Sequence, residues 1–202
     1  MTKIKICGLS RMCDIDFVNE LMPDYIGFVF APGSKRYVSP AKAAGLRARL
    51  DPWIKAVGVF AGAEEESVSD IARSGIVDML QLHGSESADY IRRVRAMSGL
   101  PVIKAFSVET SGDAINAAAS PADLILLDNG AGGTGAAFDW SLAAGIERPF
   151  FLAGGLTPQN VRRAIEETRP FAVDTSSGVE TNGLKDYNKI RLFIEAVRSA
   201  IT

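Results

Sequence analysis

The stretches FFLAGGLTP at 150–158 and FAVDTSSG at 171–178 decide the fold, because each joins a short apolar run to a turn of small residues. In the first stretch, Gly154 and Gly155 allow the backbone to come close to a ligand. We expect Thr157-Pro158 to begin a helix whose N-terminal N–H groups favour an anion. A (β/α)8 barrel binds phosphate with two such turns, placed after its last two strands. The pair therefore predicts a phosphate site.

The rest of the chain continues this alternation of short apolar runs and longer amphipathic stretches, without a linker. Runs rich in Val, Ile, Leu and Phe without polar alternation are typical of parallel strands buried on both faces. We predict eight strands, at Lys3–Cys7, Tyr25–Phe30, Ile54–Phe60, Met79–Leu82, Val102–Phe106, Leu124–Asp128, Pro149–Leu152 and Phe171–Asp174.

Helices are expected between these strands, for example over 64–74 and 86–97, with Ser39-Pro40 starting another and the last one running over 186–200. An open doubly wound sheet would usually carry a GxGxxG fingerprint in its first turn, and the first turn here is Cys7-Gly8-Leu9-Ser10. We therefore predict an α/β protein whose residues 1–202 form a single (β/α)8 TIM barrel with a parallel eight-stranded core.

The amino-acid composition excludes several classes of binding partner. The net charge of the 202-residue chain is -2, which gives no electrostatic basis for binding nucleic acid or an anionic membrane. Two cysteines cannot form a disulfide framework, and no apolar stretch is long enough to span a bilayer or to resemble a secretory leader. We expect a cytoplasmic protein that acts on a small molecule. A monomer and a homodimer both remain open.

Two residues at strand ends could carry acid–base chemistry. Cys7 ends the first strand, where a thiolate could act as a base, although a free cysteine often packs as a small apolar residue. Asp128 directly follows an apolar run and precedes Asn129-Gly130. A general acid explains that position, and the alternative is a carboxylate that caps the loop.

Three other polar residues lie at the same predicted end of the barrel. His83 could polarise a substrate oxygen or satisfy its own loop, and Arg36 could bind a carboxylate or belong to a solvated basic cluster. Asp174 ends the eighth strand. The sequence has a single histidine and no HExxH or CxxC spacing, so we expect no metal in the chemistry. A glycine-rich segment at 132–135 is a candidate loop that closes over substrate.

These residues lie in motifs that resemble the phosphoribosylanthranilate isomerase family along essentially the whole chain. The matching segments are KICGL at 5–9, GFVF at 27–30, SKRYV at 34–38, VGVF at 57–60, QLHG at 81–84, KAF at 104–106, LD at 127–128, GGTG at 132–135, LAGGL at 152–156 and DTSSGVE at 174–180. One departure is Pro32-Gly33, which bears on how Arg36 is presented.

The resemblance implies an Amadori rearrangement of N-(5-phosphoribosyl)anthranilate without a cofactor or metal. It assigns Cys7 as general base, Asp128 as general acid and Arg36 to the anthranilate carboxylate. It assigns His83 to substrate binding without a defined role, and Asp174 either to substrate binding or to holding the site together. The implied phosphate-binding residues are Gly133, Gly135, Gly154, Gly155, Ser177 and Gly178.

Other phosphosugar barrels and a non-catalytic phosphate binder are the alternatives. A pentulose-phosphate epimerase would need several metal-binding histidines, and a triose-phosphate isomerase would need a glutamate base where Asp128 stands. A binder would not need a thiol and a carboxyl group at one mouth.

Overall fold

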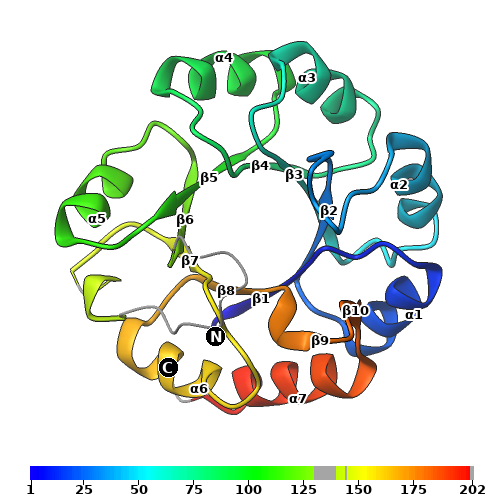
Figure 1. Cartoon of the computed structure of the whole chain (residues 1–202), viewed down its shortest axis with the longest axis vertical. Helices are drawn as coiled ribbons and strands as arrows, with labels where there is room; N and C mark the ends of the chain where they lie inside the picture. The colour runs from blue at the N-terminus through cyan, green and yellow to red at the C-terminus, as the bar shows by residue number, and fades with distance from the viewer. Residues whose placement is uncertain (130–139, 144, 201–202) are drawn as a thin grey trace.

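In a computed structural model, eight parallel strands form a closed barrel surrounded by helices (Figure 1). The structure describes residues 1–129, 140–143 and 145–200. The strands pair in chain order, and β1 pairs with β8 to close the barrel. They are β1 (Lys3–Cys7), β2 (Tyr25–Val29), β3 (Lys55–Phe60), β4 (Met79–Leu82), β5 (Val102–Ser107), β6 (Leu124–Asp128), β7 (Phe150–Leu152) and β8 (Ala172–Thr175). The predicted barrel is confirmed, with strand boundaries within one residue of those expected.

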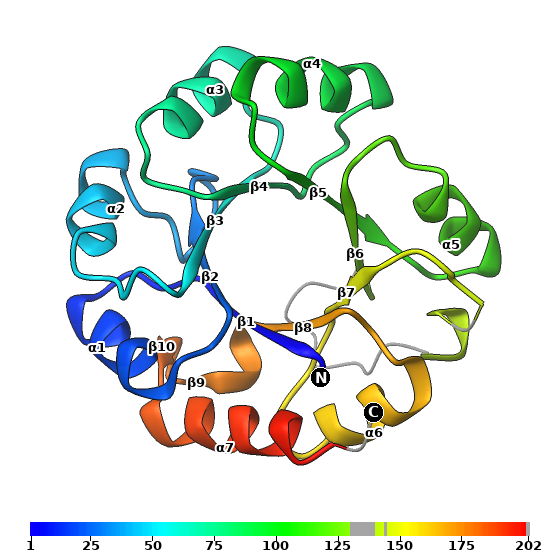
Figure 2. The ribbon, with the colours of Figure 1, turned by 180° about the vertical axis from the view of Figure 1, so that it is seen from behind.

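The helices form the outer layer, and the same arrangement is seen from the opposite face (Figure 2). They are α1 (Met12–Leu21), α2 (Pro40–Arg47), α3 (Glu65–Arg73), α4 (Ala88–Ser98), α5 (Ser111–Ala118), α6 (Val161–Thr168) and α7 (Tyr187–Arg198), with short 3-10 helices η1 (Trp140–Ala143) and η2 (Ser177–Val179). A two-stranded antiparallel hairpin, β9 (Glu180–Thr181) and β10 (Leu184–Lys185), lies between η2 and α7. In the described residues, no helix is both long and apolar enough to cross a membrane.

Helix starts follow local hydrogen bonding. The Ser39 hydroxyl accepts a hydrogen bond from the Lys42 N–H and Pro40 takes the first helical position, which confirms that prediction. The expectation of a helix at Thr157-Pro158 is wrong, because α6 begins at Val161. The Asn160 side chain accepts a hydrogen bond from the Thr157 N–H, so a turn precedes the helix. The helix α6 therefore begins three residues after Pro158, further from the glycine turn than predicted.

The strands place alternate side chains inside and outside the barrel. A buried apolar cluster that includes Val57, Leu126 and Phe151 fills the middle of the barrel, and Cys7, Val29 and Val59 form a smaller cluster. A larger core packs the helices against the strands. Cys7 therefore ends β1 on the face that the barrel encloses.

Phe151→Ala should destabilise the fold strongly. Its ring is fully buried and packs edge-to-face on Tyr25 and Phe171 at centroid distances of 5.6 and 5.7 Å. We expect the free energy of unfolding in urea to fall by about 3–5 kcal/mol. Ile115→Ala is the control, because that side chain is 69% exposed and should cost about 0.5 kcal/mol or less. Equal losses in the two variants would contradict this assignment of the core.

Candidate active site

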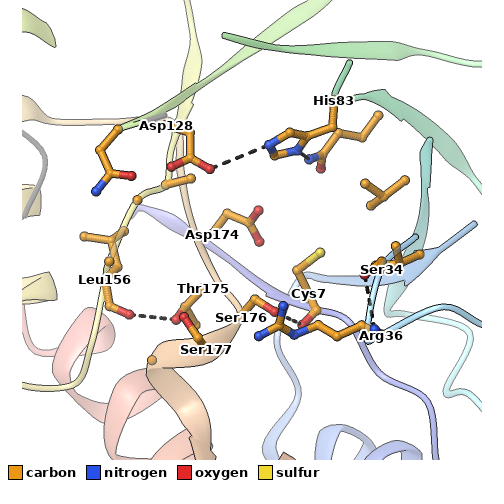
Figure 3. A pocket seen from close by; sticks show the side chains of 18 of the residues that line it. Cys7, Ser34, Arg36, His83, Asp128, Leu156, Asp174, Thr175, Ser176 and Ser177 are labelled. Atoms are coloured by element: carbon orange, nitrogen blue, oxygen red, sulfur yellow. Dashed lines mark hydrogen bonds and ion pairs between the residues drawn. The ribbon is translucent and has the colours of Figure 1, made fainter. Parts of the chain in front are cut away.

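A cavity of about 410 Å³ is lined by residues at the carboxyl ends of the strands (Figure 3). Its lining includes all of the predicted site residues that the structure describes: Cys7, Arg36, His83, Asp128, Gly154, Gly155, Asp174, Ser177 and Gly178. Gly133 and Gly135 lie outside the described residues. Closure of the barrel thus brings together residues that are far apart in sequence.

The Cys7 thiol is buried at this mouth, with 8% of the residue exposed. Gly27 on β2 makes room for it, because a Cβ on Gly27 would lie 2.6 Å from the Cys7 sulfur. Burial raises the pKa of the thiol, and the nearby cations Lys5 and Lys185 oppose that shift. Cys7 is therefore a buried thiol that two ammonium groups help to ionise.

Asp128 faces His83 across the cavity. The Asp128 Oδ2 and His83 Nε2 atoms are 3.6 Å apart (Figure 3). The Gln81 amide Nε2 lies 2.8 Å from His83 Nδ1 and acts as the donor in the amide orientation found here. The other ring nitrogen, Nε2, faces Asp128. The sequence analysis gave Gln81 no role. The available signal was that Gln81 is the one polar residue of the apolar strand β4.

The loop that carries His83 is braced from outside the barrel. Lys104 on β5 donates to the Gly84 carbonyl at 2.6 Å and lies 3.0 Å from the Glu86 carboxylate, with both side chains buried. Glu86 also accepts hydrogen bonds from the N–H groups of Gly62 and Gly84. These contacts fix the backbone just after His83.

Asp174 binds the fully buried Lys5, whose Nζ lies 3.0 Å from both carboxylate oxygens. The two residues stand opposite each other in the β1–β8 pairing. Burial raises the pKa of Asp174, and Lys5 opposes this. Sequence reasoning quoted Lys5 within a motif but gave it no role. The signal was a lysine that alternates with Ile4 and Ile6 in an apolar strand.

Arg36 lies at the cavity wall but already has a partner. Its Nε and one terminal nitrogen, Nη2, each donate to the Glu180 carboxylate at 2.8 Å. Ser34 also accepts a hydrogen bond from the Arg36 backbone N–H. Pro32 and Gly33 therefore do not keep Arg36 from the cavity. Glu180 was missed as a site residue because its partner is 144 positions away in the sequence.

The two glycine turns lie against each other. Gly154 and Gly155 have φ values of 82° and 66°, a left-handed conformation that favours glycine. The Thr175 hydroxyl donates to the Leu156 carbonyl at 2.7 Å, and a Cβ on Gly178 would collide with that same carbonyl oxygen. Within the described chain, no turn or loop hydrogen bond uses the backbone N–H of Gly155. Ser177 and Gly178 are the first two residues of η2, and N–H groups at the start of a helix have no partner within it. These turns leave N–H groups for an anion.

Among the described residues, no three histidine, cysteine or acidic side chains are grouped to hold a metal ion. The barrel and its cavity, with ionisable groups at the carboxyl ends of the strands, define a (β/α)8-barrel enzyme that acts on a small molecule.

Comparisons with known proteins identify the family. Residues 4–196 match the family described as N-(5'phosphoribosyl)anthranilate (PRA) isomerase. A relative of that name from Endomicrobium trichonymphae is 44% identical over 203 residues, which cover 98% of this chain and 100% of the relative. The chain belongs to the phosphoribosylanthranilate isomerase family. The resemblance found in the sequence is thereby confirmed, and it selects one family among the barrel enzymes considered.

Solved structures give the same result. The enzyme from Thermotoga maritima superimposes with a TM-score of 0.91 at 41% identity, covering 98% of this chain and 99% of that one. A phosphoribosyl anthranilate isomerase in complex with reduced 1-(o-carboxyphenylamino)-1-deoxyribulose 5-phosphate has a TM-score of 0.88 at 40% identity, with the same coverage.

The ionisation of Cys7 provides a direct test of the site's electrostatics. In a Cys13→Ser variant, Cys7 is the one remaining cysteine of the sequence. Because burial raises the pKa of this thiol, the thiolate should form at a higher pH than in an unfolded peptide. Ultraviolet absorbance of the thiolate against pH measures this. A thiol that ionises below its ordinary pKa would contradict the burial argument.

Proposed function

We propose that this chain isomerises N-(5'-phosphoribosyl)anthranilate to 1-(2-carboxyphenylamino)-1-deoxyribulose 5-phosphate, in tryptophan biosynthesis. The observation that carries the proposal is the meeting of Cys7, Asp128, Arg36 and the two glycine turns at one cavity. Family membership supports the same reaction. The chemistry is proton transfer, for which a thiol and a carboxyl group suffice.

The proposed reaction begins at Asp128. Its carboxyl group donates a proton to the furanose ring oxygen, the bond from that oxygen to C1 breaks, and the amine nitrogen supplies the electron pair that forms a Schiff base. The His83 Nε2 atom lies 3.6 Å from the Asp128 Oδ2 atom, so the imidazole stands beside this carboxyl group. Asp128 is 22% exposed, which leaves it open to the cavity.

Cys7 carries out the second proton transfer. Its thiolate removes the proton from C2 of the sugar, and the electrons of that bond move toward the Schiff-base nitrogen to give an enolamine. The enolamine then tautomerises to the ketose. Lys5 and Lys185 favour the thiolate that this step requires, which offsets part of the effect of burial.

Two regions bind the ends of the substrate in this proposal. Arg36 binds the anthranilate carboxylate through guanidinium N–H groups that Glu180 does not use. Gly154, Gly155, Ser177 and Gly178 bind the phosphate through backbone N–H groups, and Gly133 and Gly135 are assigned to the same role. Asp174 holds Lys5 beside Cys7, which favours the structural role over direct substrate contact.

Cys7→Ala and Asp128→Asn should each lower kcat/KM by about 10²–10⁴-fold, because each removes one proton-transfer group. Fluorescence of phosphoribosylanthranilate, generated in place from anthranilate and phosphoribosyl pyrophosphate, measures its consumption. Cys13→Ser serves as the control thiol and should keep wild-type turnover. Wild-type activity in either of the first two variants would contradict the assigned acid and base.

We also propose that the protein works in the cytoplasm as a homodimer. A solved relative that covers 98% of this chain is described as generated monomers of the dimeric phosphoribosylanthranilate isomerase from Thermotoga maritima, so that relative's parent enzyme is a dimer. Trp53, in the loop that enters β3, is 83% exposed, and Met1, which precedes β1, is 90% exposed. Both lie at the amino ends of the strands, away from the cavity.

Sedimentation velocity tests this assembly. The wild-type chain should sediment as a dimer, and Trp53→Glu should shift the population toward monomer, since it places a charge in an apolar contact. Phosphoribosylanthranilate isomerase activity of the variant checks its fold. A monomeric wild-type protein would overturn the proposed assembly without affecting the proposed reaction.

A further inference from the structure

The hairpin β9–β10 brings two charged residues, Glu180 and Lys185, into contact with Arg36 and Ser176, which line the cavity. Glu180 on β9 stands opposite Lys185 on β10 in the hairpin register. Their side chains are 7% and 2% exposed and lie 2.6 Å apart. In both ribbon views, the hairpin lies beside α1 and α7, outside the barrel strands (Figures 1 and 2). A buried ion pair on so short a hairpin needs further partners to be stable.

Glu180 has such a partner in Arg36. Its two carboxylate oxygens accept hydrogen bonds from Nε and Nη2 of Arg36, both at 2.8 Å. Burial acts to raise the pKa of Glu180, but the hydrogen bonds from Arg36 and Lys185 outweigh it, and the pKa is lowered. Glu180 is thus an ionised carboxylate held between two cations.

The pairing of Arg36 with Glu180 determines which edge of the guanidinium remains available to bind a ligand. Of the five N–H groups of arginine, the pair with Glu180 uses the one on Nε and one on Nη2. The described residues give Nη1 no acceptor, so the edge formed by Nη1 and Nη2 keeps two roughly parallel N–H groups. A second carboxylate fits that edge in a bidentate manner. The stem of Arg36 also rests on Gly8, where a Cβ would collide with Arg36 Cδ.

Lys185 links the same hairpin to the thiol. Its ammonium donates to the Ser176 carbonyl at 2.9 Å and lies 3.2 Å from the Ser176 hydroxyl, which in turn donates to the Cys7 carbonyl at 2.9 Å. The side chains of Arg36, Glu180 and Lys185 together carry one net positive charge. The cluster can therefore hold Arg36 in place and still attract an anion.

The hairpin itself is anchored from two helices. Arg11, which precedes α1, donates to the Lys185 carbonyl at 2.8 Å, and Lys189 on α7 donates to the Glu180 carbonyl at 2.6 Å. Both ends of the pair are therefore fixed independently of any ligand.

We propose that Glu180 is a positioning residue that orients Arg36 for a substrate with an aryl carboxylate, and that Lys185 completes the device by holding the Cys7 backbone through Ser176. This inference rests on the proposed function. Glu180 selects for the carboxylate without touching it, because it fixes the guanidinium of a cavity-lining arginine and leaves the Nη1–Nη2 edge free.

The test compares two ligands in a Glu180→Gln variant. Reduced 1-(o-carboxyphenylamino)-1-deoxyribulose 5-phosphate carries the aryl carboxylate, and ribulose 5-phosphate lacks it. The amide cannot form the bidentate charged pair, so we expect KM and the Kd of the carboxylated ligand to rise by about 10-fold or more. The Kd of ribulose 5-phosphate and kcat should stay within about 3-fold, since neither depends on the arginine edge.

Two comparisons separate positioning from a general structural effect. In an Arg36→Met background, Glu180→Gln should have no further effect on the Kd of the carboxylated ligand. Glu195→Gln removes one partner of the exposed Arg191–Glu195 pair on α7 and should leave both Kd values unchanged. If Glu180→Gln does not fold, Glu180→Asp gives the same comparison, because its shorter stem keeps the charge but withdraws it from Arg36.

Equal weakening of both ligands in the variant, or an unchanged KM, would overturn the positioning role. A wild-type protein that does not consume phosphoribosylanthranilate would instead overturn the proposed function. The two failures are therefore distinguishable.

Discussion

The pairing of β1 with β8 is the constraint on which the site depends. It closes the barrel and sets Lys5 opposite Asp174, so that a buried ion pair lies directly beneath the mouth. Such a pair is costly to desolvate, and removing one partner would leave an uncompensated charge in the core. Here both carboxylate oxygens bind the ammonium group, and the Cys7 thiol shares the same environment. One interaction therefore joins closure of the fold to the electrostatics of the candidate base.

Charge is organised around this mouth in two layers. Lys5 with Asp174 lies inside the barrel, and Arg36, Glu180 and Lys185 form a second cluster at its wall. Ser176 links the second cluster to the backbone of Cys7, because it accepts a hydrogen bond from Lys185 and donates one to the Cys7 carbonyl. Buried side chains in mutual contact lose little further conformational freedom when a ligand binds. The arrangement explains how the candidate acid, the candidate base and the two candidate anion sites can be held in one cavity.

The sequence predicted the fold well because parallel strands buried on both faces leave a strong apolar signal. The strands Lys3–Cys7, Met79–Leu82 and Leu124–Asp128 were predicted with their observed boundaries. Strand ends also located Cys7, His83, Asp128 and Asp174, since parallel strands place those ends at one mouth. The predicted start of α6 was wrong, because the Asn160 side chain accepts a hydrogen bond from the Thr157 N–H and holds a turn there. The partners Lys5, Gln81, Glu180 and Lys185 were not predicted, because their roles depend on contacts across the barrel that local patterns do not record.

The central claim is that one cavity orients a phosphosugar between a glycine-turn phosphate site and an arginine carboxylate site, with Cys7 at C2 and Asp128 at the ring oxygen. A crystal structure of this chain with reduced 1-(o-carboxyphenylamino)-1-deoxyribulose 5-phosphate tests it most directly. The account predicts the phosphate on the N–H groups of Gly155, Ser177 and Gly178, and the carboxylate on the Nη1–Nη2 edge of Arg36. It also predicts Cys7 and Asp128 within about 3–3.5 Å of the sugar. A phosphate bound at Arg36, or a sugar out of reach of Cys7, would contradict it.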